Sequence, residues 1–157
     1  MNLFTNVEII TEIPKAKLVS KKENVFVKYD HRPNNTLTTL DDFYETFRGK
    51  DKRTARKIIN NTRVIKYIYA KITYPLKIPA LIKFTCNDDV TITYGLLLYA
   101  YTKAYQLVYD LEHTFIKAGT YGRFGIWGYT IEDLIYNCLS TIETYDTFVV
   151  CIFDCDS

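Results

Sequence analysis

The segment from Thr91 or Thr93 to Ala118 constrains the fold more than any other part of this 157-residue chain. Apolar residues recur along one face of it at helical spacing, and Gly119 follows as a stop signal. About 25 residues at about 1.5 Å each make a helix of about 38 Å, whereas a domain of this length has a radius of gyration of about 15 Å. The expected helix therefore crosses the whole molecule. Its apolar face is formed by Leu97, Tyr101, Ala104, Val108, Leu111 and Phe115.

The other faces of this expected helix are also rich in leucine and tyrosine, for example Leu98, Tyr99 and Tyr105. A helix that is apolar nearly all round is either the central helix of a domain or a surface for association with another chain. Both interpretations stay open at the level of the sequence.

Stretches rich in β-branched and aromatic residues predict the strands. Residues 3–13 and 25–29 predict an N-terminal pair of strands, with a polar connection at 21–24 between them. Pro75 and Pro79 cannot donate to a strand ladder, so the segment between them belongs at an edge or in a loop. Three further strands are expected at residues 64–74, 81–85 and 147–153.

Capping residues predict three shorter helices. Thr39 and Asp42 resemble a capping box before a helix at 40–47 that ends at Gly49, and Asp51 is the expected N-cap of a helix at 52–60. Two short helices that meet at a glycine resemble a helix-turn-helix only in outline.

Thr130 and Asp133 form a second capping box, and an apolar stripe at helical spacing follows up to Ile142. It predicts a helix of about thirteen residues, 130–142. The expected fold is therefore α+β: one domain over residues 1–157, with N-terminal strands, a mixed or antiparallel sheet, and a long central helix packed with a shorter C-terminal helix.

Charge is divided along the chain. Residues 1–85 carry 17 Lys and Arg against 8 Asp and Glu, a net charge of +9, whereas residues 86–157 carry 3 against 10, a net charge of −7. A basic half beside an acidic half indicates either a polyanionic partner or two surfaces that satisfy each other, within one molecule or between copies of it.

The basic charge is densest between Arg48 and Lys71, where Asp51 is the single acidic residue. Tyr67 and Tyr69 lie in the same stretch and can stack on bases if they are exposed. We therefore expect non-specific contact with DNA or RNA; a solvated helix face, with lysines that shield an edge strand, is the alternative. The candidate nucleic-acid-binding residues are Arg48, Lys50, Lys52, Arg53, Arg56, Lys57, Arg63 and Lys66, with Lys71 at the end of the stretch.

Self-association is a competing hypothesis of equal standing. The chain contains fourteen tyrosines, and the long helix is apolar on several faces. The opposite charges of the two halves suit a homo-oligomer in which a basic surface meets an acidic one on the next copy. The protein would then be a structural or interaction protein.

Residues 119–128 hold four of the six glycines and the only tryptophan. Such glycines allow positive φ or close backbone approach, while Tyr121, Phe124 and Trp127 supply anchors. A glycine-rich loop before a helix can cradle a phosphate, but no clear strand precedes this one, it lacks the P-loop lysine, and Thr130 already takes the cap. We expect a packed connection between two helices, with a ligand groove and a phosphate site as open alternatives.

Residues 124–134, Phe-Gly-Ile-Trp-Gly-Tyr-Thr-Ile-Glu-Asp-Leu, together with residues 92–112, resemble uncharacterised proteins of large DNA viruses that infect amoebae. The resemblance covers about residues 90–157. Where the family pattern has His near position 129 and Asp near 130, this chain has Tyr129 and Thr130, so a titratable side chain suited to proton transfer is missing. The resemblance implies no activity. It implies a viral origin and a location in the cytoplasm or nucleus of an infected cell, with packaging in the virion as a further possibility.

Residues suited to catalysis are sparse. His31 and His113 are the only histidines, and neither has a partner at a meaningful spacing, so we expect surface or capping roles. The paired carboxylates lie where helices are expected to begin, which the helix dipole explains. We predict a protein without enzymatic activity, catalytic residues, bound metal or cofactor.

The cysteines show no CxxC pair and lie in or beside apolar runs, so we expect buried thiols in a reducing compartment, with zinc as a weaker alternative. They are Cys86, Cys138, Cys151 and Cys155. Residues 1–11 lack a secretory signal, and charged or polar residues interrupt the longest apolar stretch, 94–111. We expect a soluble intracellular protein with no membrane partner and no small-molecule substrate.

Overall fold

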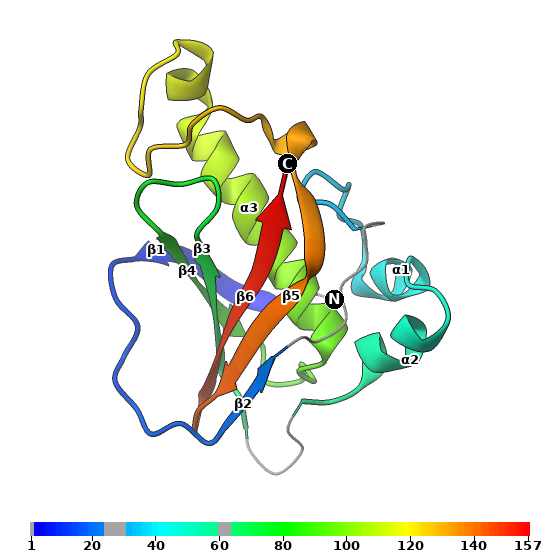
Figure 1. The fold of residues 1–157 in the computed structure, drawn as a ribbon. Coiled ribbons are helices and arrows are strands. Elements are labelled where there is room, and N and C mark those ends of the chain that lie inside the picture. The colour runs from blue at the N-terminus through cyan, green and yellow to red at the C-terminus, as the bar shows by residue number, and fades with distance from the viewer. Residues whose placement is uncertain (1, 24–30, 60–63) are drawn as a thin grey trace.

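The computed structural model describes residues 2–23, 31–59 and 64–157, and a mixed sheet forms its largest part (Figure 1). The strand order is β1-β4-β3-β6-β5-β2. Neighbouring strands are antiparallel except β3 and β6, which run parallel. The strands are β1 (Phe4–Ile10), β2 (Ser20–Glu23), β3 (Tyr67–Ile72), β4 (Ala80–Cys86), β5 (Ile135–Thr144) and β6 (Phe148–Asp156).

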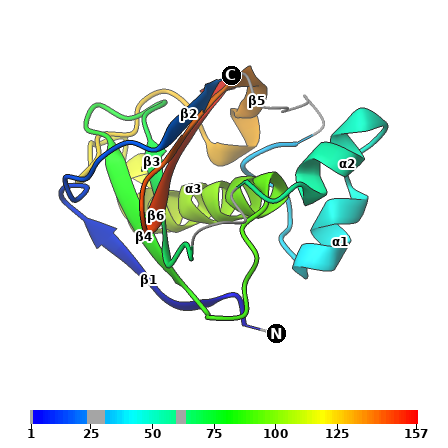
Figure 2. The same cartoon turned by 90° about the horizontal axis from the view of Figure 1, so that it is seen from below.

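Helix α3 lies on one face of this sheet, and two short helices pack on α3 on the side away from the strands (Figure 2). The helices are α1 (Leu40–Glu45), α2 (Lys50–Arg56), α3 (Tyr94–Lys117) and the single 3-10 turn η1 (Ile131–Asp133). The predicted α+β class and the long helix are confirmed. The strands expected at 64–74, 81–85 and 147–153 are present as β3, β4 and β6 with slightly different ends.

Both predicted ends of α3 are confirmed, but its apolar face is not buried throughout. Thr93 is the N-cap, with Oγ1 accepting the Leu96 N–H at 3.1 Å, and the chain leaves the helix at Gly119, where φ is 69°. Leu111 and Phe115 were expected in the core, yet they are 51% and 44% exposed. The reason is geometric: Figure 1 shows that the C-terminal turns of α3 extend beyond the strands.

The core between α3 and the sheet contains tyrosines whose hydroxyl groups are satisfied. Tyr101 and Tyr105 donate to the carbonyl oxygens of Lys71 and Tyr74 at 2.5 and 2.7 Å. The Tyr136 hydroxyl lies 2.9 Å from Thr102 Oγ1. Burial raises the pKa of all three phenols above its usual value. These side chains therefore contribute large apolar rings to the core without leaving a buried donor unsatisfied.

The predicted helix at 130–142 is wrong, because the chain forms η1 and then strand β5 in this region. The capping box is real: Asp133 Oδ2 accepts the Thr130 N–H at 2.9 Å, but it closes a single 3-10 turn. A register shift in the pairing with β6 lies between Tyr136 and Ser140. It breaks the period of two, so the apolar positions imitate helical spacing.

The N-terminal strands do not pair with each other. β2 lies in the segment predicted as a polar connection, which is a further correction, and the strand expected at 25–29 falls outside the described residues. β1 and β2 occupy opposite edges of the sheet. Residues 11–19, which we call the strap, join them across the face that α3 leaves open, where Ile13 packs on Tyr69, Phe148 and Val150.

The thiols of Cys86, Cys151 and Cys155 are free and buried, as predicted, and burial raises the pKa of Cys86 and Cys155 to about 12. The prediction for Cys138 concerns a side chain outside the described part of the structure. Within the described ranges, no helix is both long and apolar enough to cross a lipid bilayer.

Candidate nucleic-acid interface

The predicted basic residues lie mostly on α2 and at its two ends. α2 begins after Gly49, whose φ of 59° suits glycine, so the expected N-cap Asp51 lies inside the first turn instead. The helix ends earlier than the predicted residue 60, because Lys57 is extended and Ile58 forms a bridge with Thr93.

α1 and α2 are held on α3 by a close contact at Gly95. A Cβ atom at this position would lie 2.7 Å from Tyr44 Cε1 and 2.9 Å from the Ala55 carbonyl oxygen. The Tyr44 hydroxyl also forms a 2.5 Å hydrogen bond with Thr93 Oγ1. The two short helices therefore sit in a fixed position at the N-terminal end of α3.

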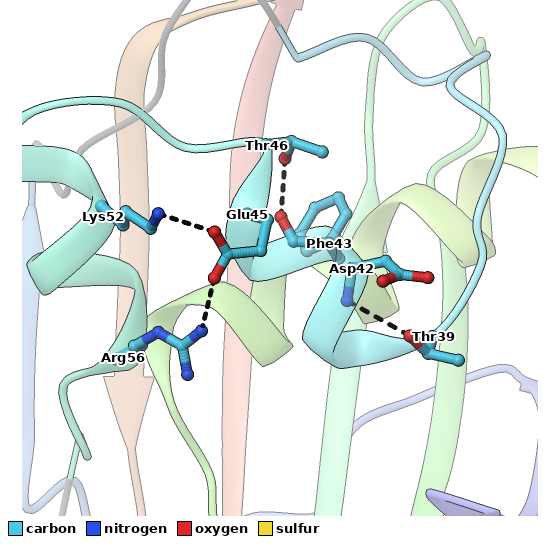
Figure 3. A network of polar contacts seen from close by, with 7 residues as sticks. All are labelled: Thr39, Asp42, Phe43, Glu45, Thr46, Lys52 and Arg56. Atoms are coloured by element: carbon cyan, nitrogen blue, oxygen red, sulfur yellow. Dashed lines mark hydrogen bonds and ion pairs between the residues drawn. The ribbon is translucent and has the colours of Figure 1, made fainter.

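Glu45 on α1 joins the two short helices (Figure 3). Its Oε2 accepts a hydrogen bond from Lys52 Nζ at 2.6 Å, and its Oε1 accepts one from the Arg56 guanidinium at 3.2 Å. The hydrogen bond from Lys52 is the main reason that the pKa of Glu45 lies below its usual value. Two of the predicted binding residues are thus partly neutralised by a carboxylate of the same chain.

Four predicted residues keep their charge available: Arg48, Lys50, Arg53 and Lys57. All four are exposed, and no carboxylate among the described residues lies within ion-pair distance of them. Lys50 and Arg53 are three residues apart on α2 and therefore project from one side of it. We call these four residues the α2 cation group.

The remaining basic residues lie elsewhere. Lys66 lies just before β3 and lines a separate pocket with Asp88, and Lys71 is a partly buried β3 residue. Arg63 falls outside the described residues. The predicted stretch is therefore not one surface, because the chain leaves the helical corner and enters the sheet.

The two tyrosines expected to stack on bases make contacts within the protein instead. Tyr69 is 2% exposed, and its ring packs edge-on against Phe148 with 5.1 Å between centroids. Tyr67 is partly buried, and Lys83 Nζ lies 4.4 Å from its ring centroid. The prediction of base stacking is wrong for Tyr69, because the strap gives this face of the sheet its own apolar cluster.

The histidines are not brought together. His31 was expected in a surface or capping role, but it is 3% exposed, stacks on Phe47 at 4.2 Å and hydrogen-bonds through Nε2 to Thr46 Oγ1 at 2.9 Å. His113 is exposed near the end of α3. In the described part of the chain, no three His, Cys, Asp or Glu side chains are placed to share a metal ion.

Two glutamates that hold neighbouring segments in place were missed at the level of sequence. Glu45 precedes Lys52 and Arg56 by seven and eleven residues, so only a model of the turn at Gly49 would have brought them together. Glu112 is 2% exposed, and its Oε1 accepts the Phe124 N–H at 2.6 Å. A carboxylate on a largely apolar helix was its only signal, and Asp110 gives the same signal two residues earlier.

Comparison of this chain with known proteins gives no match. No family model matches this chain. No curated protein and no solved structure matches it either. The case for a function therefore rests on the residues described above.

Proposed function

We propose that this protein has a binding role rather than a catalytic one, and that it contacts nucleic acid without sequence selectivity through the α2 cation group. The observation that supports this proposal is the set of four exposed cationic side chains on one short helix and its ends, free of carboxylate partners among the described residues. Arg and Lys in such an arrangement suit the phosphate backbone, which carries the electrostatic part of binding.

The expected salt dependence is specific. If the four side chains each contact a phosphate of duplex DNA, log K falls with log salt at a slope of about −3.6, from about −0.9 per contact. Fluorescence anisotropy with two duplexes of unrelated sequence, measured across a salt series, gives this slope directly. Equal affinity for both duplexes is expected, because phosphate contacts carry no sequence information.

A charge-reversal variant tests the position of the surface. In the variant K50E/R53E/K57E the salt dependence should become shallower: the slope should change from about −3.6 to about −0.9, since three phosphate contacts are lost. The matched control K15E/K17E/K22E changes net charge by the same amount at exposed positions in the strap and β2. If both variants weaken binding equally, net charge and not the α2 cation group drives it, and the proposal fails.

Self-association is a second candidate, favoured by the exposed Leu111 and Phe115 at the end of α3. The expected partner is a second copy of this chain, packed along the continuation of the buried apolar face. Sedimentation equilibrium should show a dimer that L111K/F115K converts to a monomer. A wild-type protein that stays monomeric at about 100 μM would exclude a stable dimer.

A further inference from the structure

The 119–128 loop forms one wall of a pocket of about 410 Å³ at the C-terminal end of α3, the end far from the α2 cation group. This volume lies in the range of small-molecule sites. Three aromatic side chains and one carboxylate line the pocket. They are Tyr121, Trp127, Tyr129 and Asp133.

Hydrogen bonds to the rest of the molecule hold the backbone that carries these rings. Glu112 accepts the Phe124 N–H from inside the molecule, and a Cβ atom on Gly122 would lie only 1.7 Å from Glu112 Oε2. The Phe124 carbonyl oxygen accepts the N–H groups of Lys77 and Ile78 at 3.0 and 3.1 Å. The loop is therefore tied to both α3 and the segment after β3, so its rings are presented on a fixed backbone.

Two of the rings are widely exposed to solvent although the backbone of the loop is held in place. Trp127 is 44% exposed and Tyr121 is 59% exposed. The rings of Trp127 and Tyr129 lie 6.1 Å apart between centroids and are tilted by 50°, so they form two walls of a partial cage. Large exposed aromatic rings on a rigid loop are typical of binding sites, because covering them lowers the free energy.

The charge in the pocket selects the sign of the ligand. Asp133 is the only acidic or basic residue among the described residues that line it, and its Oδ2 accepts the N–H and O–H groups of Thr130 at 2.9 and 3.1 Å. Aromatic faces carry negative electrostatic potential and attract cations. Lys77 Nζ already lies 3.9 Å from the Tyr121 ring centroid, so one face of this ring is covered by a cation of the chain and only its other face can meet a ligand.

We propose that this pocket binds a methylated ammonium group, carried either by a small molecule such as choline or by a methylated lysine side chain. A primary ammonium brings three N–H donors, whereas the lining carboxylate has one oxygen, Asp133 Oδ1, that accepts no hydrogen bond from the described residues, since Oδ2 already accepts two. A methylated ammonium needs fewer or no acceptors and places its positive charge against the rings of Trp127 and Tyr129.

Trp127 is the only tryptophan, so its fluorescence reports on the pocket directly. Titration with choline chloride should give a saturable emission change that sodium chloride does not reproduce. The neutral isostere 3,3-dimethylbutan-1-ol should bind about tenfold more weakly, because it lacks the charge. Equal affinity for the isostere, or no saturation up to about 100 mM choline, would overturn the proposal.

Variants locate the site. Tyr121→Leu and Asp133→Asn should each weaken choline binding about fivefold, from the loss of one ring or of the carboxylate charge. Phe115→Leu is the matched control, since Phe115 is as exposed as Trp127 but does not line the pocket. A loss of binding in Phe115→Leu equal to that in Tyr121→Leu, with unchanged circular dichroism in both, would show that binding occurs elsewhere.

Two peptides separate the sources of the ligand. A peptide with a trimethylated lysine should quench Trp127, whereas the same peptide with an unmodified lysine should bind at least about tenfold more weakly. Peptide binding tighter than that of free choline assigns the pocket to modified proteins, and binding of equal strength assigns it to the small cation. A preference for the unmodified peptide would contradict the proposal.

Discussion

Two glutamates tie neighbouring segments together near the two ends of α3, in opposite surroundings. Glu45 is 58% exposed and joins α1 to α2 through Lys52 and Arg56. Glu112 is 2% exposed and holds a backbone N–H of the 119–128 loop. Exposed ion pairs contribute little to stability, whereas a buried carboxylate that loses its partner is costly. Glu45 therefore tunes surface charge, and Glu112 fixes a shape.

High pH should produce the largest effect on stability. In the unfolded chain a thiol titrates near 9.0, whereas burial keeps Cys86 and Cys155 protonated up to about 12. Below pH 9 these thiols are neutral in the folded and the unfolded state, so they make the free energy of unfolding no more dependent on pH. As pH rises from 9 to 12 only the unfolded state loses thiol protons, so the free energy of unfolding falls. We expect the urea midpoint to drop by more than half between pH 8 and pH 11.

The buried phenols of the core act in the same direction, since burial raises their pKa as well. A double variant, C86A/C155A, should lose less stability over this pH range than the wild type does. A urea midpoint that stays constant up to pH 11 would mean that these thiols are not buried.

Gly122→Ala should have the next largest effect. The new Cβ would meet Glu112 Oε2 and would also lie 2.7 Å from Phe115 Cδ2, so the carboxylate must leave the Phe124 N–H. We expect a loss of about 3 kcal/mol in the free energy of unfolding, measured by urea denaturation. Gly119→Ala is the control. Its φ is 69°, but the added Cβ would have no atom of a more distant residue within 4 Å, so backbone strain alone should cost about 1 kcal/mol. Equal losses would show that the contact with Glu112 is unimportant.

Glu112→Gln keeps the volume and an acceptor oxygen but removes the charge. A hydrogen bond to a charged group contributes about 1.5–3 kcal/mol, and a neutral one about 1 kcal/mol. We therefore expect a loss of about 1 kcal/mol, with faster hydrogen exchange at the Phe124 amide than elsewhere in the loop. Unchanged exchange at that amide would mean that Glu112 does not hold it.

Glu45→Gln should have the smallest effect on stability and the clearest one on charge. It releases Lys52 and Arg56, which increases the cationic surface beside the α2 cation group. We expect no measurable change in Tm, about threefold tighter binding to duplex DNA at low salt, and a salt slope steeper by up to about 1.8. Weaker binding in this variant would place the nucleic-acid contact away from α2.

The sequence predicts α3 and most strands well, because their signals are local. Thr93 and Gly119 mark the ends of α3, and β3 is dense in residues that favour strands. The helix expected at 130–142 fails because the capping box and the apolar spacing agree with each other, while the pairing of β5 with β6 overrides both.

The candidate site is predicted less well, since it depends on contacts between distant residues. Basic residues that are close in sequence divide between the α2 corner and the sheet once the chain enters β3. The burial of Tyr69 depends on Ile13 in the strap, which no local pattern relates to β3. The pinning of the 119–128 loop depends likewise on Glu112, a residue that sequence reasoning passed over.

The strap also shapes the order in which this chain can fold. Five strand spacings of about 4.8 Å separate the sheet edges by about 24 Å, and ten steps of about 3.3 Å give the strap a reach of about 33 Å, so little slack remains. Its two flanking strands pair with β4 and with β5, which is made some 110 residues later. During synthesis the N-terminal segment cannot complete its strand pairing until β5 has been made. This requirement favours slow and highly cooperative folding.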